Sequence, residues 1–217
     1  MRFFISFRMT KVRKLCTYSI AIIPLLFIIS SCSIRGYKPI ANSEISKTLE
    51  LYVFGDEFKK AVYKTNINIY SNNLTGLTLI KKTDSAYRVV SMSELGIKYM
   101  DIEFPFDRHK SAKVHYIMKP LNRKMLVNMF IKDFSLLFYP PEIETSILQE
   151  NENGSMLVRN KSLVYFIDSA STISEIGKTR FLFPVKNIIR LSGTNNYSPN
   201  TIIIDHGKIN YEFNIVR

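Results

Sequence analysis

The chain is poor in the residues that support thiol, metal and sugar-stacking chemistry. Its 217 residues include two cysteines, three histidines and no tryptophan. The cysteines, Cys16 and Cys32, both lie near the N-terminus, so the rest of the chain can form no disulfide within itself. His109, His115 and His206 have no histidine or cysteine partner at metal-ligand spacing, and no metal site is predicted. We therefore expect a domain that is stabilised by its packed core alone.

Acidic residues are absent from the N-terminal segment. Residues 1–14 carry five basic side chains and no acid, and residues 15–34 carry no charge at all. A basic stretch followed by a short apolar one is typical of a secretory signal peptide. The sequence Ile29-Ser30-Ser31-Cys32 resembles the lipobox of bacterial lipoproteins, in which the cysteine thiol receives diacylglycerol. The resemblance predicts that residues 1–31 are a signal peptide and that Cys32 is the acylated first residue of the mature protein.

An uncleaved membrane anchor is the alternative interpretation of this segment. About 20 apolar residues are long enough to cross a bilayer as a helix. Pro24 interrupts the apolar stretch, however, and two small residues and a cysteine end it, which favours cleavage. Two acyl chains suffice for stable anchoring. We therefore expect residues 32–42 to be a lipidated tether and the mature protein to need no transmembrane helix.

The positive charge of the chain is moderate once the signal is removed. The signal holds five of the 30 basic residues and none of the 18 acidic ones, so the mature chain has a net charge of +7. These charges are spread along the sequence. Nucleic acid is not an expected partner of an exported protein, and we attribute the charge to solubility and to mild attraction to anionic head groups.

Residues 43–217 are expected to form a single domain that is mainly β with helices. Ser43–Phe54 has a capping serine and apolar residues at helical spacing, which predicts a short N-terminal helix. Alternating segments bounded by polar turns predict antiparallel strands. The predicted strands are Phe58–Tyr70, Leu74–Lys81, Ala86–Ser93, Ile97–Phe104, Ser111–Met118, Ser155–Arg159, Leu163–Asp168, Thr179–Phe183, Asn187–Leu191, Thr201–Asp205 and Lys208–Val216. Gly193–Pro199 is predicted to be a loop.

Asn122–Phe138 is predicted to be a central helix that is apolar on almost every side. The segment contains no glycine or proline, can begin with Asn122 as a cap, and precedes Pro140 and Pro141. Its polar side chains form one narrow strip. A helix this apolar must be buried on more than one side.

Asp101 and Glu103 are the residues most typical of catalysis. Residues at i and i+2 of a strand share one face about 7 Å apart, within the range for acid/base work on a glycosidic bond. Ile102 and Phe104 would point to the opposite face, however, so we expect the acids on the solvated side. The sequence contains no nucleophile elbow, phosphate loop or dinucleotide motif. We therefore expect no enzymatic activity and no cofactor.

The order of the predicted elements resembles the LolA/LolB fold, in which helices plug a half-open antiparallel β-barrel. The segment Leu74–Phe104 is the most similar part, and it resembles a strand, a basic hairpin and a Leu-Gly pair of the LolB lipoprotein receptor. The matching positions are Gly76, Lys81, Tyr87, Arg88, Leu95 and Gly96. That family usually has a proline before the Leu-Gly pair, where this chain has Glu94. The resemblance implies a half-open barrel of about 10–11 strands with an N-terminal helix and a central plug helix.

The resemblance also implies a cleft for acyl chains beside the central helix, because a curved sheet cannot fill its own concavity. Flexible methionines suit a variable apolar guest. The candidate lining residues are Met125, Leu126, Met129, Phe130, Phe134 and Leu137. The alternative interpretation is that the apolar side chains among them are ordinary core.

These observations predict an outer-membrane lipoprotein that faces the periplasm. Ser33 after the cysteine resembles outer-membrane sorting, and the tether is basic, with Arg35 and Lys38 and no acid. Its partners would be the membrane, through acylated Cys32, a lipid or lipoprotein ligand, and a periplasmic carrier protein. The alternative function is that of a structural or assembly lipoprotein, which would use the same fold as a protein-interaction module of the cell envelope.

Replacing Cys32 by Ala tests the anchor. We expect unprocessed precursor or soluble material in place of membrane-bound protein, because the acylated thiol is removed. Membrane fractionation and mass spectrometry of the N-terminus measure both outcomes. A Cys32→Ala protein with a normal acylated N-terminus would refute the assignment.

Overall fold

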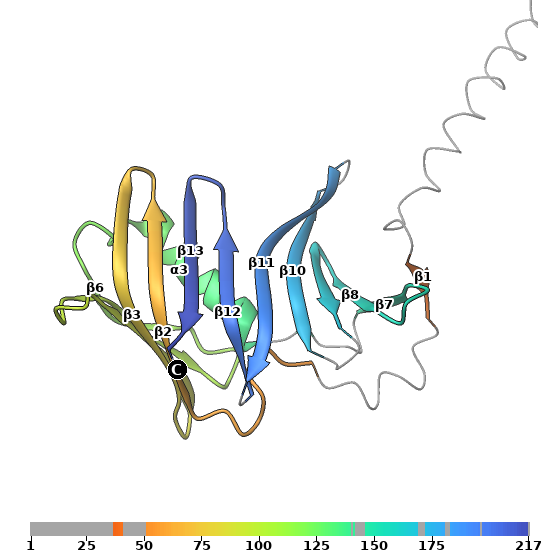
Figure 1. Ribbon diagram of the computed structural model, residues 1–217, viewed down its shortest axis with the longest axis horizontal. Helices are drawn as coiled ribbons and strands as arrows, with labels where there is room; N and C mark the ends of the chain where they lie inside the picture. The colour runs from red at the N-terminus through yellow and green to blue at the C-terminus, as the bar shows by residue number, and fades with distance from the viewer. Residues whose placement is uncertain are drawn as a thin grey trace, which may run out of the picture.

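The computed structural model describes residues 37–40, 51–139, 141, 146–168, 172–180, 183–195 and 197–216. In these residues the chain forms one open sheet of 13 strands and one helix, α3 (Figure 1). All pairs of neighbouring strands are antiparallel. The expected fold class, an open antiparallel sheet with a helix, is confirmed, with 13 strands where about 10–11 were expected.

The first half of the sheet is a meander of five strands. They are β2 (Lys60–Ile69), β3 (Asn72–Lys82), β4 (Ala86–Met92), β5 (Lys98–Pro105) and β6 (Lys113–Ile117). Their alternation explains why they form: Ile67 and Ile69 of β2 are buried, whereas Asn66 and Asn68 are half-buried on the opposite face. The five predicted strands of this region are confirmed to within a few residues.

The second half of the sheet follows the helix. It consists of β7 (Ile147–Glu150), β8 (Met156–Asn160), β9 (Leu163–Ile167), β10 (Ile173–Arg180), β11 (Phe183–Asn195), β12 (Ser198–Asp205) and β13 (Ile209–Ile215). The predicted strands that match β8, β9, β12 and β13 are confirmed. The last strand, β13, pairs with β2 from Ile209 opposite Ile69 to Ile215 opposite Tyr63, and this pairing joins the two halves.

Two sequence predictions in the second half are wrong. Thr179–Phe183 was expected to be one strand, but β10 ends at Arg180 and β11 begins at Phe183. Gly193–Pro199 was expected to be a loop, but Thr194 pairs with Pro199 and Asn195 with Ser198. Pairing between neighbouring strands here overrides the local preference of a polar, glycine-containing segment.

Strand β1 (Lys38–Pro39) lies within the predicted tether and pairs with β7 at one edge of the sheet. The amide of Ile40 donates to the carbonyl of Leu148 (3.1 Å), and the ring of Tyr37 contacts that of Phe166 (6.3 Å between centroids). Lys38 and Pro39 of the predicted tether, residues 32–42, are therefore part of the sheet, where a free tether was expected.

The predicted N-terminal helix, Ser43–Phe54, lies mostly outside the described residues. Its last part is not helical, because Tyr52 forms an isolated bridge with Thr172. Leu51, Val53 and Phe54 are buried in the core. Among the described residues, no helix combines the length and the apolar character that a membrane span requires.

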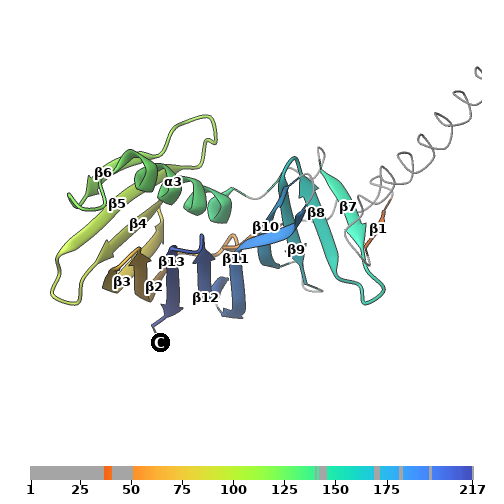
Figure 2. The same ribbon diagram turned by 90° about the horizontal axis from the view of Figure 1, so that it is seen from above.

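Helix α3 (Lys124–Phe138) lies against the inner side of the curved sheet (Figure 2). Arg123 is its N-cap and makes no side-chain cap hydrogen bond, so the expected cap at Asn122 is not used. The helix buries one broad face and exposes Met125, Asn128 and Lys132. Phe134 of α3 packs on Phe104 of β5 and on Phe213 of β13, so the helix covers the sheet where the two halves meet.

Gly76 allows β3 and β4 to approach each other closely. A Cβ atom at Gly76 would lie 2.0 Å from the backbone oxygen of Met92, and a backbone atom cannot move aside as a flexible side chain can. We expect Gly76→Ala to lower the free energy of unfolding by at least about 1–3 kcal/mol, the usual effect of overpacking. Urea denaturation measures the loss.

Thr75→Ala is the matched control for this prediction. Thr75 is exposed on the same strand, and only its backbone carbonyl accepts the bond from Tyr99 Oη. We expect a change of less than about 1 kcal/mol. Equal effects of the two substitutions would show that the contact at Gly76 does not matter.

Candidate functional site

The inner face of α3 places most of the predicted cleft residues in a filled core. Leu126, Phe130, Phe134 and Leu137 are between 0 and 2% exposed. Phe130 packs on Tyr211 of β13 (5.3 Å between ring centroids), and Phe134 packs on Phe104, Phe138 and Phe213 at 5.9–6.2 Å. In this structure these side chains stabilise the helix on the sheet.

The two predicted methionines lie elsewhere on the helix. Met125 is 57% exposed, and Met129 is half-buried against the core. The six residues predicted to line one cleft are thus divided between the core and the outer surface. None of them lines the pocket that the structure forms at the C-terminal end of α3.

Aromatic side chains gather at this end of the helix. Phe138, in the last turn of α3, stacks on Tyr87 of β4, with 4.6 Å between ring centroids and 7° between ring planes. Phe54 and Phe104 contact Phe138 at 5.6 and 5.1 Å. Phe106 contacts Tyr87 edge-on at 5.3 Å between ring centroids. Packed rings of this kind make a rigid apolar wall.

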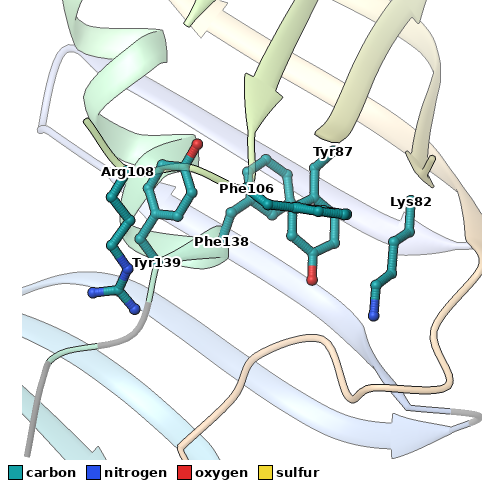
Figure 3. A pocket seen from close by; sticks show the side chains of 6 residues that line it. All are labelled: Lys82, Tyr87, Phe106, Arg108, Phe138 and Tyr139. Atoms are coloured by element: carbon teal, nitrogen blue, oxygen red, sulfur yellow. The ribbon is translucent and has the colours of Figure 1, made fainter. Parts of the chain in front are cut away.

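The pocket lies between this aromatic cluster and two cationic side chains. It has a volume of about 370 Å³ and is lined by Lys82, Tyr87, Phe106, Arg108, Phe138 and Tyr139. Figure 3 shows Lys82 and Arg108 on opposite sides of the rings, with their charged ends pointing in the same direction. The volume lies near the lower limit of typical ligand sites, roughly 300–1,000 Å³.

Hydrogen bonds and ring contacts fix the rim of the pocket. Lys82 Nζ donates to the backbone oxygen of Asp56 (2.8 Å), and Tyr139 Oη donates to the backbone oxygen of Pro105. The Arg108 guanidinium lies 5.9 Å from the centre of the Tyr139 ring, within cation–π range. Burial raises the pKa values of Tyr87 and Tyr139, so both phenols stay neutral at physiological pH.

Sequence reasoning did not predict this pocket. In the sequence, Lys82 and Arg108 fall in polar stretches, where a basic residue usually indicates only a solvated surface. One feature could have indicated the pocket: Tyr87, Phe106 and Tyr139 each lie at or just beyond the end of a strand or helix. Aromatic residues at such ends can gather in space, but the pairing order of the strands decides whether they do.

A buried carboxylate connects α3 to the turn between β12 and β13. Asp133 is 2% exposed, and its Oδ2 lies 2.9 Å from His206 Nε2. Burial raises the pKa of Asp133, and the bond to His206 opposes that rise in part. Tyr211 Oη, also buried, has no hydrogen-bond partner among the described residues, and burial together with nearby Asp133 raises its pKa.

Asp101 and Glu103 lie on the face opposite Ile102 and Phe104, as expected, but Asp101 is not solvated. Its side chain is 3% exposed, because Arg88 and Lys98 cover it with contacts of 2.9 and 3.1 Å. The hydrogen bonds from Arg88 lower the pKa of Asp101. Hydrogen bonds with His115 and Lys113 lower that of Glu103. Both acids are therefore ionised members of ion pairs on the outer face of the sheet.

No group of three or more potential metal ligands occurs within the described ranges of the chain. His109 lies in the exposed loop after β5, His115 pairs with Glu103, and His206 pairs with Asp133. Cys32, the predicted lipid anchor, lies outside the described residues.

Comparisons with known proteins do not identify a family. No family model and no curated protein matches the chain. Among solved structures, the chain is similar to a domain from Vibrio parahaemolyticus that is described provisionally as an outer membrane lipoprotein-sorting protein. The two share 7% identity with a TM-score of 0.34, over 81% of this chain and 89% of that one. A TM-score this low supports no conclusion about the function of this chain.

Asp133→Asn tests whether the buried carboxylate of Asp133 makes the stability of the protein depend on pH. A folded-state pKa above the unfolded value means that the folded protein binds this proton more tightly. The stability of the wild type should therefore fall as the pH rises from about 4 through the raised pKa, and then level off. We expect the stability of Asp133→Asn not to decline in this way. Its melting temperature should therefore rise relative to that of the wild type as the pH increases.

Melting curves at several pH values between about 4 and 7 measure this difference. Glu212→Gln, which removes an exposed carboxylate from β13, is the control and should melt in parallel with the wild type. A constant difference between Asp133→Asn and the wild type would contradict the prediction.

Proposed function

We propose that the protein is an envelope lipoprotein that binds acyl chains of lipids or of lipoproteins at the end of helix α3. The observation that carries this proposal is the open pocket of about 370 Å³ with its wall of packed aromatic rings. Half-exposed Phe106, at 38%, offers apolar surface directly to a ligand. Each methylene buried there would contribute about 0.8 kcal/mol.

The proposed acyl site replaces the cleft expected from the sequence. The inner face of α3 is filled by its own side chains, so a ligand at Phe130 or Phe134 would have to displace core contacts. Binding at Phe106 and Phe138 needs no such rearrangement, because the pocket is already open. Helix α3 would then stay in place on the sheet, and only its C-terminal end would contact the ligand.

Acylated Cys32 would hold the protein in the outer membrane, on the periplasmic side. Support comes from the lipobox-like Ile29-Ser30-Ser31-Cys32 and from Ser33. The resemblance of Leu74–Phe104 to the LolB receptor agrees with this location and with transfer of a ligand from a periplasmic carrier.

We propose a binding role without catalysis. The two acids most typical of an enzyme, Asp101 and Glu103, are engaged in ion pairs on the outer face of the sheet, away from the aromatic pocket. Their lowered pKa values suit permanent anions and not a general acid, which must carry a proton at working pH.

A protein-interaction module is the second candidate function. Leu95 and Ile97, between β4 and β5, are 90% and 59% exposed, and Val114 and Tyr116 of edge strand β6 are each 44% exposed. Exposed apolar side chains on a loop and a sheet edge are typical of contact surfaces. This function requires no acyl ligand, so ligand binding separates the two candidates.

Photolabelling of the full-length mature protein with a photoreactive 16-carbon fatty acid tests acyl binding. We expect labelled peptides from the pocket. We expect Phe106→Ala to reduce this labelling several-fold, because the exposed face of the wall is removed, while the melting temperature changes little. Phe130→Ala should instead cost about 3–5 kcal/mol of stability, as expected for a filled core.

Val114→Ala is the control, since Val114 is an exposed apolar residue of edge strand β6 and not a lining residue of the pocket. It should leave both labelling and melting unchanged. If the wild type is labelled no more than an unrelated lipoprotein, acyl binding is refuted and the interaction module is favoured.

A further inference from the structure

We propose that the outer face of β2–β5, the face of the sheet opposite α3, binds an anionic lipid surface. This face is separate from the aromatic pocket and from the predicted anchor at Cys32, so the inference goes beyond the proposed function. The basic residues are spread along the sequence, but antiparallel pairing places basic residues of different strands next to one another.

One row of basic side chains crosses three strands. Lys60 of β2 lies directly opposite Lys81 of β3, and Lys81 lies directly opposite Arg88 of β4. Directly opposite residues of antiparallel strands point to the same face, with Cβ atoms about 5 Å apart, and like charges in such pairs are destabilising. The fold alone gives no reason for Lys60 and Lys81 to face each other, whereas a shared anionic partner does.

Apolar side chains lie beside this basic row. The next row across the same three strands is half-buried and consists of Val62, Leu79 and Val90. Beyond it, Leu77 of β3 is 37% exposed, and Lys64 of β2 lies opposite Leu77. The outer face is therefore an apolar stripe with basic residues on both sides. Lysine stems can lie along such a stripe while their ammonium groups reach a charged surface.

The acidic residues of this face do not neutralise its lysines. The two carboxylates, Asp101 and Glu103, are held by basic neighbours on β4, β5 and β6. Within the described ranges, no ion pair includes Lys60, Lys64 or Lys81, and all three are exposed. Their charges are thus available to a partner outside the sheet.

A lipid surface complements this face better than an acidic protein does. Figure 2 shows α3 on the concave side of the sheet, and in Figure 1 the strands β2 and β3 lie in front of it, so no described element covers the outer face. Lysine is a point charge on a flexible stem and not a planar fork that fixes one geometry. Such charges suit the many mobile phosphates of a bilayer, and the apolar stripe suits its interfacial region.

Lysine footprinting of the full-length mature protein tests this surface. The protein is mixed with vesicles of neutral phosphatidylcholine, or of phosphatidylcholine with an equal amount of anionic phosphatidylglycerol. An amine-reactive acetylating reagent is added, and mass spectrometry measures the labelling of each lysine. On anionic vesicles we expect several-fold lower labelling of Lys60, Lys64 and Lys81 than on neutral ones. Labelling should recover in about 1 M salt, where screening limits the attraction to about 3 Å.

Two lysines on the opposite side of the molecule are the internal control. Lys124 and Lys132 are exposed on α3, and their labelling should be the same on both kinds of vesicle. Equal loss of labelling at these positions would mean that the protein has no preferred face, and would overturn the proposal.

A double variant, Lys60→Gln with Lys81→Gln, removes two charges of the basic row. Each basic residue near an anionic surface strengthens binding by roughly fivefold, so Lys64 of this variant should be labelled about equally on both kinds of vesicle. The melting temperature should not fall, because the substitutions remove a repulsion. The matched control, Lys124→Gln with Lys132→Gln, removes the same charge from α3 and should keep the wild-type labelling of Lys64.

The outcomes decide between the partners and do not depend on acyl binding in the pocket. Equal labelling of wild-type Lys60, Lys64 and Lys81 on both kinds of vesicle overturns the lipid surface and leaves an acidic protein as the partner of this face. Loss of the difference in the control variant also overturns the proposal, because net charge alone would then account for the binding.

Discussion

The pairing of β13 with β2 is the constraint on which the arrangement of the molecule depends. In the described part of the sheet, the order of strands passes from the C-terminal half to the N-terminal half only through this pair. The helix strengthens the same junction: Phe134 contacts Phe104 of β5 and Phe213 of β13, and so packs on both halves at once.

Because the residues that pair are about 140 positions apart, their contact closes a long loop, which favours slow folding relative to the local hairpins. The aromatic pocket requires that junction, since α3 is positioned over β4 and β5 partly by its contacts with β13.

The helix is held by apolar contacts and oriented by a polar one. Burial of Leu126, Phe130 and Leu137 supplies most of its stabilisation, but apolar contacts alone tolerate small rotations and shifts. The bond between Asp133 and His206 fixes one helix position relative to the turn between β12 and β13. Such a buried polar contact contributes little net stability, and its value lies in specifying one arrangement among similar ones. The end of α3 with Phe138 and Tyr139 depends on that orientation.

The fold could be predicted from the sequence further than the site could. Alternation in β2 to β5 and the uninterrupted apolar helix were sufficient for the class of fold and for most strand positions. They failed at β10 and at the ends of β11 and β12, where glycine and polar residues pair because neighbouring strands are present. Most apolar residues of α3 were correctly expected to be buried, but the helix buries one broad face only and Met125 is 57% exposed. Periodicity also cannot distinguish a side chain that fills a core from one that lines a cleft. The pocket joins Lys82, Phe106 and Tyr139 from three separate segments, and no local pattern in the sequence connects them.

Strand β1 determines how the molecule would stand on a membrane. Lys38 follows Cys32 by six residues, and at about 3.5 Å per residue a fully extended chain spans roughly 20 Å. In the acylated protein that we propose, the β1–β7 edge must therefore remain within that height above the lipid head groups. The strand order places β4, which carries Tyr87 of the pocket, ten strand spacings from β1, or up to about 50 Å along the sheet. The domain would then rotate about its anchored edge. The distant pocket could reach many positions above the bilayer while the protein stays attached to the membrane.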